Sequence, residues 1–298
     1  MSNILAVTGI TGHTGGFFLR ELINHKYEGI IRCLVRTTSN TTALDNSGLK
    51  IEKVVGNISD ESTLKELLHG ADAVMHIVNI RHSIPVLKMA TAEGVERAVF
   101  IHTTGIYSKF RTASDEYKEI EAEMHRLLKN STIDVTIIRP TMIYGDMCDH
   151  NIHKFIKMVD KLPIMPEIDR GSGRIRPVNA RDLGKASYQV MTRSDLPELS
   201  YDVSGEKSLT LHELFEMIGA YLGKNTHFLS VPMWFGIFCA KALKTVTLGK
   251  KDMVEKVLRM GEDRDYDHDA ATRDFGYQPE SFDVGLKREV EQYKAVNK

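Results

Sequence analysis

The fold of this chain is decided by its opening stretch, Ile4-Leu5-Ala6-Val7-Thr8-Gly9-Ile10-Thr11-Gly12-His13-Thr14-Gly15-Gly16-Phe17-Phe18-Leu19. An apolar strand, a glycine-rich turn and an amphipathic helix follow one another directly. Gly9 permits the tight turn, Gly12 lets the backbone approach a pyrophosphate, and Gly15 lets the helix start pack close to the strand. The free N–H groups and positive dipole end of the helix then face the anion. The stretch predicts a dinucleotide phosphate cradle, to which Thr11, His13 and Thr14 also contribute contacts.

Apolar runs rich in β-formers alternate with helical patterns through the first half of the chain. Continuous rather than alternating apolar strands are typical of a parallel sheet covered by helices on both faces. We therefore predict an α/β fold built on a Rossmann-type, doubly wound parallel sheet. The predicted strands are residues 4–7, 30–35, 51–55, 73–78, 98–102 and 135–138, and the predicted helices are residues 15–24, 60–69, 83–93 and 114–129.

The pattern changes after Pro140, which suggests a second, smaller unit. We expect residues 1–145 to form the dinucleotide-binding domain, with residues 178–204 returning to it. Residues 146–177 and 205–298 are expected to form a smaller α/β substrate lobe over the carboxyl edge of the sheet, where ligands of such folds bind. Further helices are predicted at residues 152–161, 180–191, 211–222, 252–259 and 284–293, with a strand at 201–203.

Two features of the second half are predicted to be structural only. Trp234 and Phe235, together with Met233, are expected to pack the interior of the smaller lobe. The charged run 261–265 is expected to be a solvated loop.

Composition excludes several classes of function. Lys plus Arg (39) nearly equals Asp plus Glu (40), so no overall field favours nucleic acid or an anionic membrane as a partner. The three cysteines are far apart and show no metal-site or disulfide spacing, which predicts no metal and a reducing compartment. The first strand begins at once, leaving no room for a signal peptide, and the apolar stretch 231–243 is too short to span a bilayer. We expect a cytoplasmic protein.

The order of these motifs resembles the short-chain dehydrogenase/reductase superfamily, in its extended branch of epimerase/dehydratase-like proteins or a close atypical relative. The likeness covers almost the whole chain. It is carried by residues 8–15, 54–58, 74–77, 102–107, 138–145, 174–178 with Asp182, and 274–279. The resemblance implies a nicotinamide cofactor, with Asn57 and Ile58 at the adenine, and Thr103, Pro140 and Ile143 among the cofactor contacts.

The second strand indicates which nicotinamide cofactor binds. An NAD site usually places Asp or Glu about 20 residues past the glycines, to accept hydrogen bonds from the ribose. Here the strand ends in Val35-Arg36-Thr37-Thr38-Ser39, without an acid. Arg36 can bind a 2′-phosphate, which predicts NADP(H) over NAD(H). The alternative is a surface arginine stacked on the adenine, which would tolerate either cofactor.

The catalytic positions depart from the family pattern. Redox-active members place a Ser or Thr after the fifth strand, and a Tyr with a Lys four residues later on the next helix. Thr104, or its neighbour Thr103, fits the hydroxyl. Tyr117 and Lys118 are adjacent, so their side chains diverge by roughly 100° on a helix. Glu121 stands four residues past Tyr117, and its negative charge would raise a phenol pKa.

Three interpretations of this break remain open. The helix starts irregularly, so that Tyr117 and Lys118 converge; another group (Tyr107, Tyr144 or His102) serves as acid; or the protein binds cofactor without turnover. Our leading hypothesis is an oxidoreductase or sugar epimerase/dehydratase that moves hydride between the nicotinamide and a hydroxyl or carbonyl carbon. Thr104, Tyr117 and Lys118 would be catalytic.

The expected substrate is a small molecule, with a sugar or nucleotide-sugar as one class, and a homodimer is among the expected assemblies. The substrate would enter between the lobes, near Tyr144 and Arg176. The alternatives are a redox-sensing regulator similar to the NmrA-like proteins, which binds NADP(H) without turnover, and a structural subunit that retains a cofactor.

Overall fold

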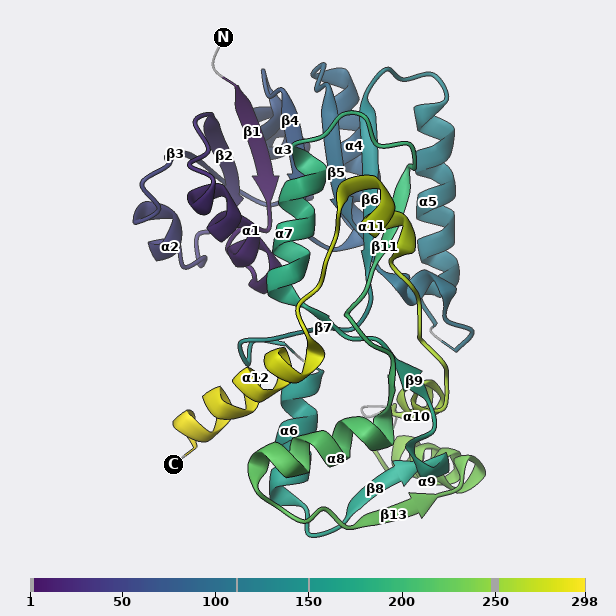
Figure 1. Ribbon diagram of the computed structural model, residues 1–298. Helices are drawn as coiled ribbons and strands as arrows, with labels where there is room; N and C mark the ends of the chain where they lie inside the picture. The colour runs from purple at the N-terminus through teal and green to yellow at the C-terminus, as the bar shows by residue number, and fades with distance from the viewer. Residues whose placement is uncertain (1–2, 111, 150, 248–251, 298) are drawn as a thin grey trace.

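The computed structural model describes residues 3–110, 112–149, 151–247 and 252–297. Its centre is a seven-stranded parallel sheet in the order β3-β2-β1-β4-β5-β6-β11 (Figure 1). This order reverses direction between β1 and β4, as in a doubly wound sheet. The strands are β1 (Ile4–Thr8), β2 (Ile30–Val35), β3 (Lys50–Val55), β4 (Ala73–His76), β5 (Arg97–Ile101), β6 (Asp134–Pro140) and β11 (Ser200–Val203).

Helices cover both faces of the sheet because its central strands are apolar on both sides. On β1, Val7 faces one core and Ala6 faces the other. One face is covered by α1 (His13–Asn24), α7 (Ala180–Met191) and α11 (Asp269–Phe275); the other is covered by α3 (Glu61–Leu68), α4 (Ser83–Ala92) and α5 (Ser114–Leu128). The fold class predicted from the sequence is confirmed.

The smaller lobe lies at the carboxyl ends of the strands, below the sheet in Figure 1. Its core joins residues of α6, α8 and α12 with Met165 of β8, and β8 pairs in parallel with β13. The elements of this part are α6 (Ile152–Lys161), β8 (Met165–Ile168), α8 (Leu211–Leu222), β13 (Phe228–Val231), α9 (Met233–Val246), α10 (Val254–Met260) and α12 (Phe282–Val296). Short elements complete the chain: α2 (Thr42–Asp45), η1 (Ile80–His82), η2 (Thr104–Tyr107), η3 (Asp169–Gly171), β7 (Ile143–Tyr144), β9 (Arg174–Ile175), β10 (Val178–Asn179) and β12 (Leu209–Thr210).

The chain passes between the lobes more often than its motifs suggest. Residues 178–204 contribute α7 and β11 to the upper lobe, where β11 pairs with β6. Residues 205–298 were expected to lie wholly in the smaller lobe, yet α11 packs on the upper sheet, with Ala271 and Phe275 in its core. A helix as short as α11 carries too little periodic signal to be assigned to a face from sequence.

Two expectations about the second half are wrong. Trp234 is 71 % exposed and does not pack the interior of the smaller lobe. The run 261–265 is partly buried: Glu262 is 8 % exposed and Arg264 is half-buried. Among the described residues, no helix is both long and apolar enough to cross a bilayer.

Candidate functional site

The glycine loop has the geometry of a phosphate cradle. Gly9 has a φ of +77°, and the N–H of Gly12 donates to the carbonyl of Gly9 at 3.0 Å, which closes the turn before α1. A Cβ at Gly15 would lie 2.2 Å from the Gly9 oxygen and 2.6 Å from the Cα of Ile10. Only glycine allows this approach, and it leaves the first turn of α1 open to an anion. The residues present therefore fit a bound dinucleotide.

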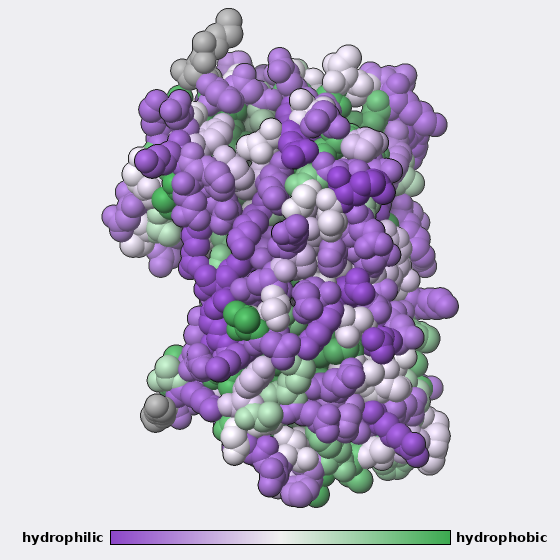
Figure 2. All heavy atoms as spheres, in the orientation of Figure 1, coloured by the Kyte–Doolittle hydropathy of each residue, from purple (hydrophilic) through white to green (hydrophobic). Residues whose placement is uncertain are grey.

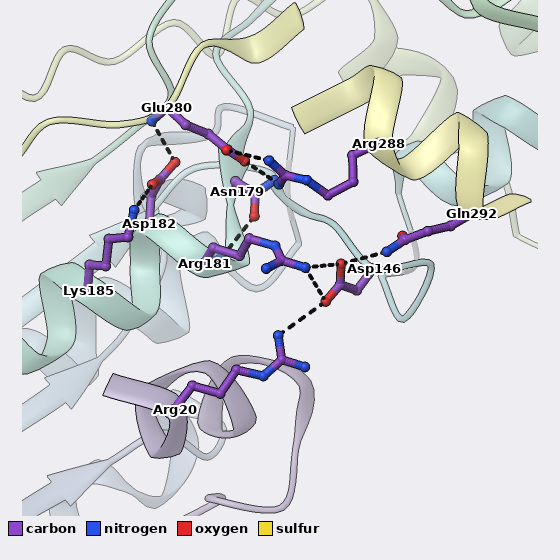
Figure 3. Close-up of polar contacts among 9 residues, drawn as sticks. All are labelled: Arg20, Asp146, Asn179, Arg181, Asp182, Lys185, Glu280, Arg288 and Gln292. Carbon is purple, nitrogen blue, oxygen red and sulfur yellow. Dashed lines mark hydrogen bonds and ion pairs between the residues drawn. The ribbon is translucent and has the colours of Figure 1, made fainter. Parts of the chain in front are cut away.

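Asp146 joins the beginning of α1 to the smaller lobe. Figure 3 shows its carboxylate accepting hydrogen bonds from Arg181 of α7 at 2.8 Å and from Gln292 of α12 at 3.1 Å, with Arg20 of α1 at 3.6 Å. Asp146 itself has a left-handed backbone, with φ +54°. His13 begins α1 near this loop, and burial lowers the pKa of its imidazole. The polar network links α12 of the smaller lobe to α1 and α7 of the upper lobe.

The residues predicted at the adenosine end lie where β2 and β3 end. Arg36, Thr37 and Thr38 are exposed after β2, with the N–H of Arg36 bonded to Ser39 Oγ at 3.0 Å. Asn57 is exposed after β3 and its amide oxygen accepts from the N–H of Ser59 at 3.0 Å. Because β2 and β3 are parallel neighbours, these groups meet at the same edge of the sheet as the glycine loop.

A cavity of about 340 Å³ lies at the carboxyl ends of β5 and β6. It is lined from the upper lobe by Thr103, Thr104 and Ile143, which the sequence analysis places in the site. The remaining lining residues include Ser108, Thr141, Asn151, Arg259, Arg264 and Tyr266. The structure thus brings part of the predicted cofactor and catalytic set together with two arginines that the sequence analysis did not select.

The two threonines use their hydroxyl groups differently. Thr104 Oγ1 donates to the carbonyl of Pro140 at 3.2 Å, which commits its proton to the backbone. Thr103 Oγ1 accepts from the N–H of Gly105 at 3.0 Å, so its own proton is available to another acceptor. Pro140 is buried at the end of β6 and serves here as an acceptor through its carbonyl.

Arg264 is the most unusual charge in the cavity. Burial and the neighbouring Arg259 lower the pKa of its guanidinium to about 10, and its Nε has no hydrogen-bond partner among the described residues. Its position is fixed by Glu262, which accepts from Ser108 Oγ and from the N–H of Lys109, both at 2.7 Å. Two arginines at one cavity favour an anionic ligand group. Sequence reasoning missed them because a charged run usually lies in solvent.

The predicted catalytic pair does not meet at this cavity. Tyr117 is 4 % exposed and packs with Ile80 and Ile106. Lys118 points to solvent on another side of α5, where its Nζ lies 3.1 Å from Asp115. The two side chains diverge on a regular helix, so the interpretation in which an irregular start makes them converge is wrong.

A buried ionic network fills the region beneath the cavity. Glu121 accepts from His102 Nδ1 at 2.9 Å and from Arg139 Nε at 3.0 Å. Burial opposes the ionisation of Glu121, but these two partners outweigh it and lower its pKa to about 2. Arg139 also donates to the Tyr107 hydroxyl at 2.9 Å, and that hydroxyl donates to Asp202 at 3.2 Å.

Two other members of this network, Tyr107 and Asp202, have raised pKa values. Burial and the carboxylate of Asp202 raise the pKa of Tyr107 to about 12. Burial likewise raises the pKa of Asp202 to about 6, although Arg139 and Tyr107 oppose that shift. Tyr107 is 41 % exposed, and its ring lies 5.0 Å from that of Tyr266, which lines the cavity. Of the alternative acids considered, Tyr107 is the one beside the cavity wall.

The two predicted substrate residues have structural contacts. Tyr144 is 1 % exposed and its ring packs against Phe282 at 5.4 Å. Arg176 pairs through its Nε with Asp265 at 3.0 Å. Arg176 therefore supports the loop that carries Arg264, and Tyr144 anchors α12.

Comparisons with known proteins agree with this architecture. A family model of NAD(P)H-binding proteins matches residues 9–160, which is more than half of the chain. UDP-glucose 4-epimerase of Vibrio cholerae is 25 % identical over an alignment 344 positions long, which covers 100 % of this chain and 97 % of that protein.

Solved structures extend the likeness over the whole fold. UDP-glucuronic acid 4-epimerase from Bacillus cereus, solved with UDP-glucuronic acid and NAD, superposes with a TM-score of 0.76 at 16 % identity, covering 99 % of each chain. The dTDP-glucose 4,6-dehydratase DesIV from Streptomyces venezuelae, solved with NAD and TYD, gives 0.73 at 21 % identity, covering 98 % of this chain and 97 % of that one. The chain belongs to the NAD(P)H-binding family, with the architecture of an extended, epimerase/dehydratase-like short-chain dehydrogenase/reductase.

Proposed function

We propose that this protein is an NADP(H)-dependent oxidoreductase or epimerase acting on a hydroxyl or carbonyl carbon of a substrate that carries a phosphate or diphosphate group. A nucleotide-sugar is the substrate class that fits best. The observation that carries the proposal is the cavity beside Thr103, which is lined by the half-buried Arg264 and by Arg259, both positively charged. An anionic substrate would relieve the repulsion between these two guanidinium groups.

The cofactor roles follow from the positions of the loops. Gly9, Gly12 and Gly15 would hold the pyrophosphate at the start of α1, and Arg36 would bind the 2′-phosphate. A bound nicotinamide supplies hydride exchange with the substrate carbon. Support for NADP over NAD is the basic, hydroxyl-rich end of β2, which carries no carboxylate at the ribose position.

The proposed catalytic roles rest on the hydrogen bonds of the two threonines and on the family positions of Tyr117 and Lys118. Thr103 fits the role of the hydroxyl that polarises the substrate oxygen better than Thr104, because the Thr104 hydroxyl donates its proton to the carbonyl of Pro140. Tyr117 and Lys118 remain the proposed acid/base and ribose contact by family position. Their placement means that either would need a rearrangement of the start of α5 to reach the cavity.

The same placement favours a second candidate, a redox-sensing regulator that binds NADP(H) without turnover. A protein that never protonates a substrate has no need of a Tyr/Lys pair at the cavity. Glu121, which stands four residues past Tyr117, is neutralised by Arg139 and bonded to His102. A carboxylate held in this way serves stability rather than the activation of a phenol.

Calorimetric titration tests the cofactor assignment. The protein is titrated with NADP⁺, NADPH, NAD⁺ and NADH, alone and as Arg36→Ala. We expect the phosphorylated pair to bind at least about tenfold more tightly, and the variant to lose that preference. Equal binding of all four by the wild type would remove the NADP assignment.

Binding of UDP and dTDP to the NADP⁺ complex tests the anion site. We expect Arg264→Gln to weaken this binding by about tenfold or more, whereas the exposed control Arg126→Gln leaves it unchanged. Turnover of a nucleotide-sugar that is abolished in Tyr117→Phe or in Tyr107→Phe would identify the acid. If NADPH binds much more tightly than NADP⁺ and no substrate is turned over, the protein would be assigned as the redox sensor instead.

A further inference from the structure

Helix α9 (Met233–Val246) packs on the smaller lobe by a narrow, small-residue side. Gly236 and Ala240 are its buried residues. A Cβ at Gly236 would lie 2.7 Å from Ile168 Cδ1 and 3.1 Å from Val257 Cγ1, so this side faces β8 and α10. The contact fixes which side of α9 is turned outward.

The outward side of α9 is apolar. Trp234 is 71 % exposed, Phe238 64 % and Val246 82 %, with Phe235 and Leu243 also exposed at 43 % and 40 %. At roughly 100° per residue, the first four of these fall in a sector of about 120° opposite Gly236, together with Ala242 and Thr245. A surface helix ordinarily turns polar residues to solvent and apolar ones to the core. Here the pattern is inverted.

This end of the molecule is visibly less polar than the rest. In Figure 2 the face of the upper lobe is largely hydrophilic, and green residues recur along the lower edge, the end that carries β8, β13 and α9 in Figure 1. Exposed clusters of large apolar residues mark interaction sites in soluble domains.

The segment that carries this face is exclusively basic. The sequence from Lys224 to Lys251 contains five lysines and no Asp or Glu, although the whole chain is nearly balanced at 39 basic and 40 acidic residues. Lys241 lies at the edge of the apolar sector of α9, about 20° from Trp234. Lys244 lies farther round the helix, and its Nζ is 2.6 Å from Asp252 Oδ2. The partner must therefore offer both negative charge and an apolar interior.

We propose that the outward face of α9 docks on an anionic lipid bilayer surface. Trp234, Phe238 and Val246 would enter the boundary between headgroups and acyl chains, while Lys241 meets the lipid phosphates. This is peripheral contact and involves no spanning segment. It departs from our expectation of no membrane partner, which rested on the charge of the whole chain and not on its distribution.

A second copy of the chain fits this face less well. In a two-fold dimer each copy presents the same segment, residues 224–251, which has lysines but no Asp or Glu and so offers no opposite charge to its counterpart. An anionic bilayer presents the opposite charge. The proposal does not depend on the proposed function, because it concerns a surface outside the cavity.

Trp234 is the only tryptophan in the chain, so its fluorescence reports on this face alone. The full-length protein is mixed with vesicles of phosphatidylcholine, or of phosphatidylcholine with about one-third phosphatidylglycerol, and followed by emission and co-sedimentation. We expect a blue shift and sedimentation with the anionic vesicles, reversed at high salt, and at least about tenfold weaker partition into neutral vesicles.

Matched variants locate the contact. Phe238→Ser is expected to reduce partition by about tenfold or more. Val246→Ser should reduce it as well, whereas Val296→Ser, a similarly exposed valine at 74 % on α12, should not. Lys241→Glu should weaken binding, and Lys129→Glu, on α5's exposed end, should not. Unchanged melting curves show that the variants fold.

Three results would overturn the proposal. One is the absence of both a blue shift and co-sedimentation with anionic vesicles. Another is equal, salt-independent binding to neutral vesicles. The third is light scattering that shows a wild-type dimer converted to a monomer by Phe238→Ser, without vesicle binding, since this would assign the face to a second copy.

Discussion

Replacing Gly15 by alanine tests the phosphate loop most directly. The added Cβ would lie 2.2 Å from the Gly9 carbonyl oxygen and 2.6 Å from the Cα of Ile10, and both are backbone atoms that cannot rotate away. Ordinary van der Waals contact begins at 3.4 Å, so α1 must move from the loop by about 1 Å. Overpacking of this kind costs about 1–3 kcal/mol of unfolding free energy.

Gly16→Ala is the matched control, because it lies in the same helix turn and its Cβ would meet nothing within 4 Å. There alanine should raise stability by about 0.5–1 kcal/mol. Thermal unfolding and calorimetric titration with NADPH compare the two variants. We expect Gly15→Ala to lose at least about tenfold in affinity and Gly16→Ala to bind as the wild type does. Wild-type affinity in a folded Gly15→Ala protein would refute the assignment of this loop to the pyrophosphate.

Four further predictions concern residues that line the cavity or lie beneath it. Glu121→Gln should cost about 3–5 kcal/mol in chemical denaturation at pH 7, because it leaves the Arg139 guanidinium buried without its carboxylate; a loss below about 1 kcal/mol would contradict the buried pair. Since the pKa of Glu121 falls from 4.5 to about 2, the wild type should lose roughly 3 kcal/mol on acidification from pH 5 to pH 2, and the variant should show a flatter profile. The pH dependence that Asp202 contributes runs the other way. Its pKa rises from 3.8 to about 6, so the free energy of unfolding falls by about 2 kcal/mol as pH rises between these values. Asp202→Asn should remove that fall, and an unchanged pH profile would refute the assignment. Thr104→Val should lower the melting temperature by breaking the bond to Pro140, whereas Thr103→Val should reduce turnover or ligand affinity with little effect on melting.

The first half of the fold could be predicted from sequence because its signals are local. Most strands between 4 and 138 are apolar runs, with β3 (Lys50–Val55) the most polar of them, and the observed ends differ from the predicted ones by a few residues at most. Helix α8 was also predictable, since Thr210 and Glu213 form the capping box that their spacing indicates. Patterns of this kind are read without knowing what a segment touches.

The candidate site likewise contains residues that local sequence patterns predict and residues that only long-range contacts bring there. The glycine loop and Thr103 are encoded beside their own strands, and the structure places them at the carboxyl edge of the sheet. Arg264 is held at the cavity by long-range contacts: its N–H donates to the carbonyl of Arg174 at 2.8 Å, and Glu262 bonds a loop some 150 residues earlier. No local pattern indicates these contacts. Trp234 was misplaced for a related reason. An apolar periodicity shows that a helix has an apolar side but does not say whether that side is covered.

The late return of α11 to the upper sheet has a consequence for how the protein is made. A ribosome releases the first six strands long before β11 (Ser200–Val203) and α11 (Asp269–Phe275) emerge. Until then, β6 has an unpaired edge, and the core that receives Phe275 and Tyr277 stays open to solvent. The nascent chain therefore carries an aggregation-prone intermediate through most of its synthesis, and a holdase chaperone would bind there. Termination between residues 203 and 269 would leave all seven strands in place but part of the upper core without the cover of α11, so we expect the upper lobe to fold poorly as a simple N-terminal fragment.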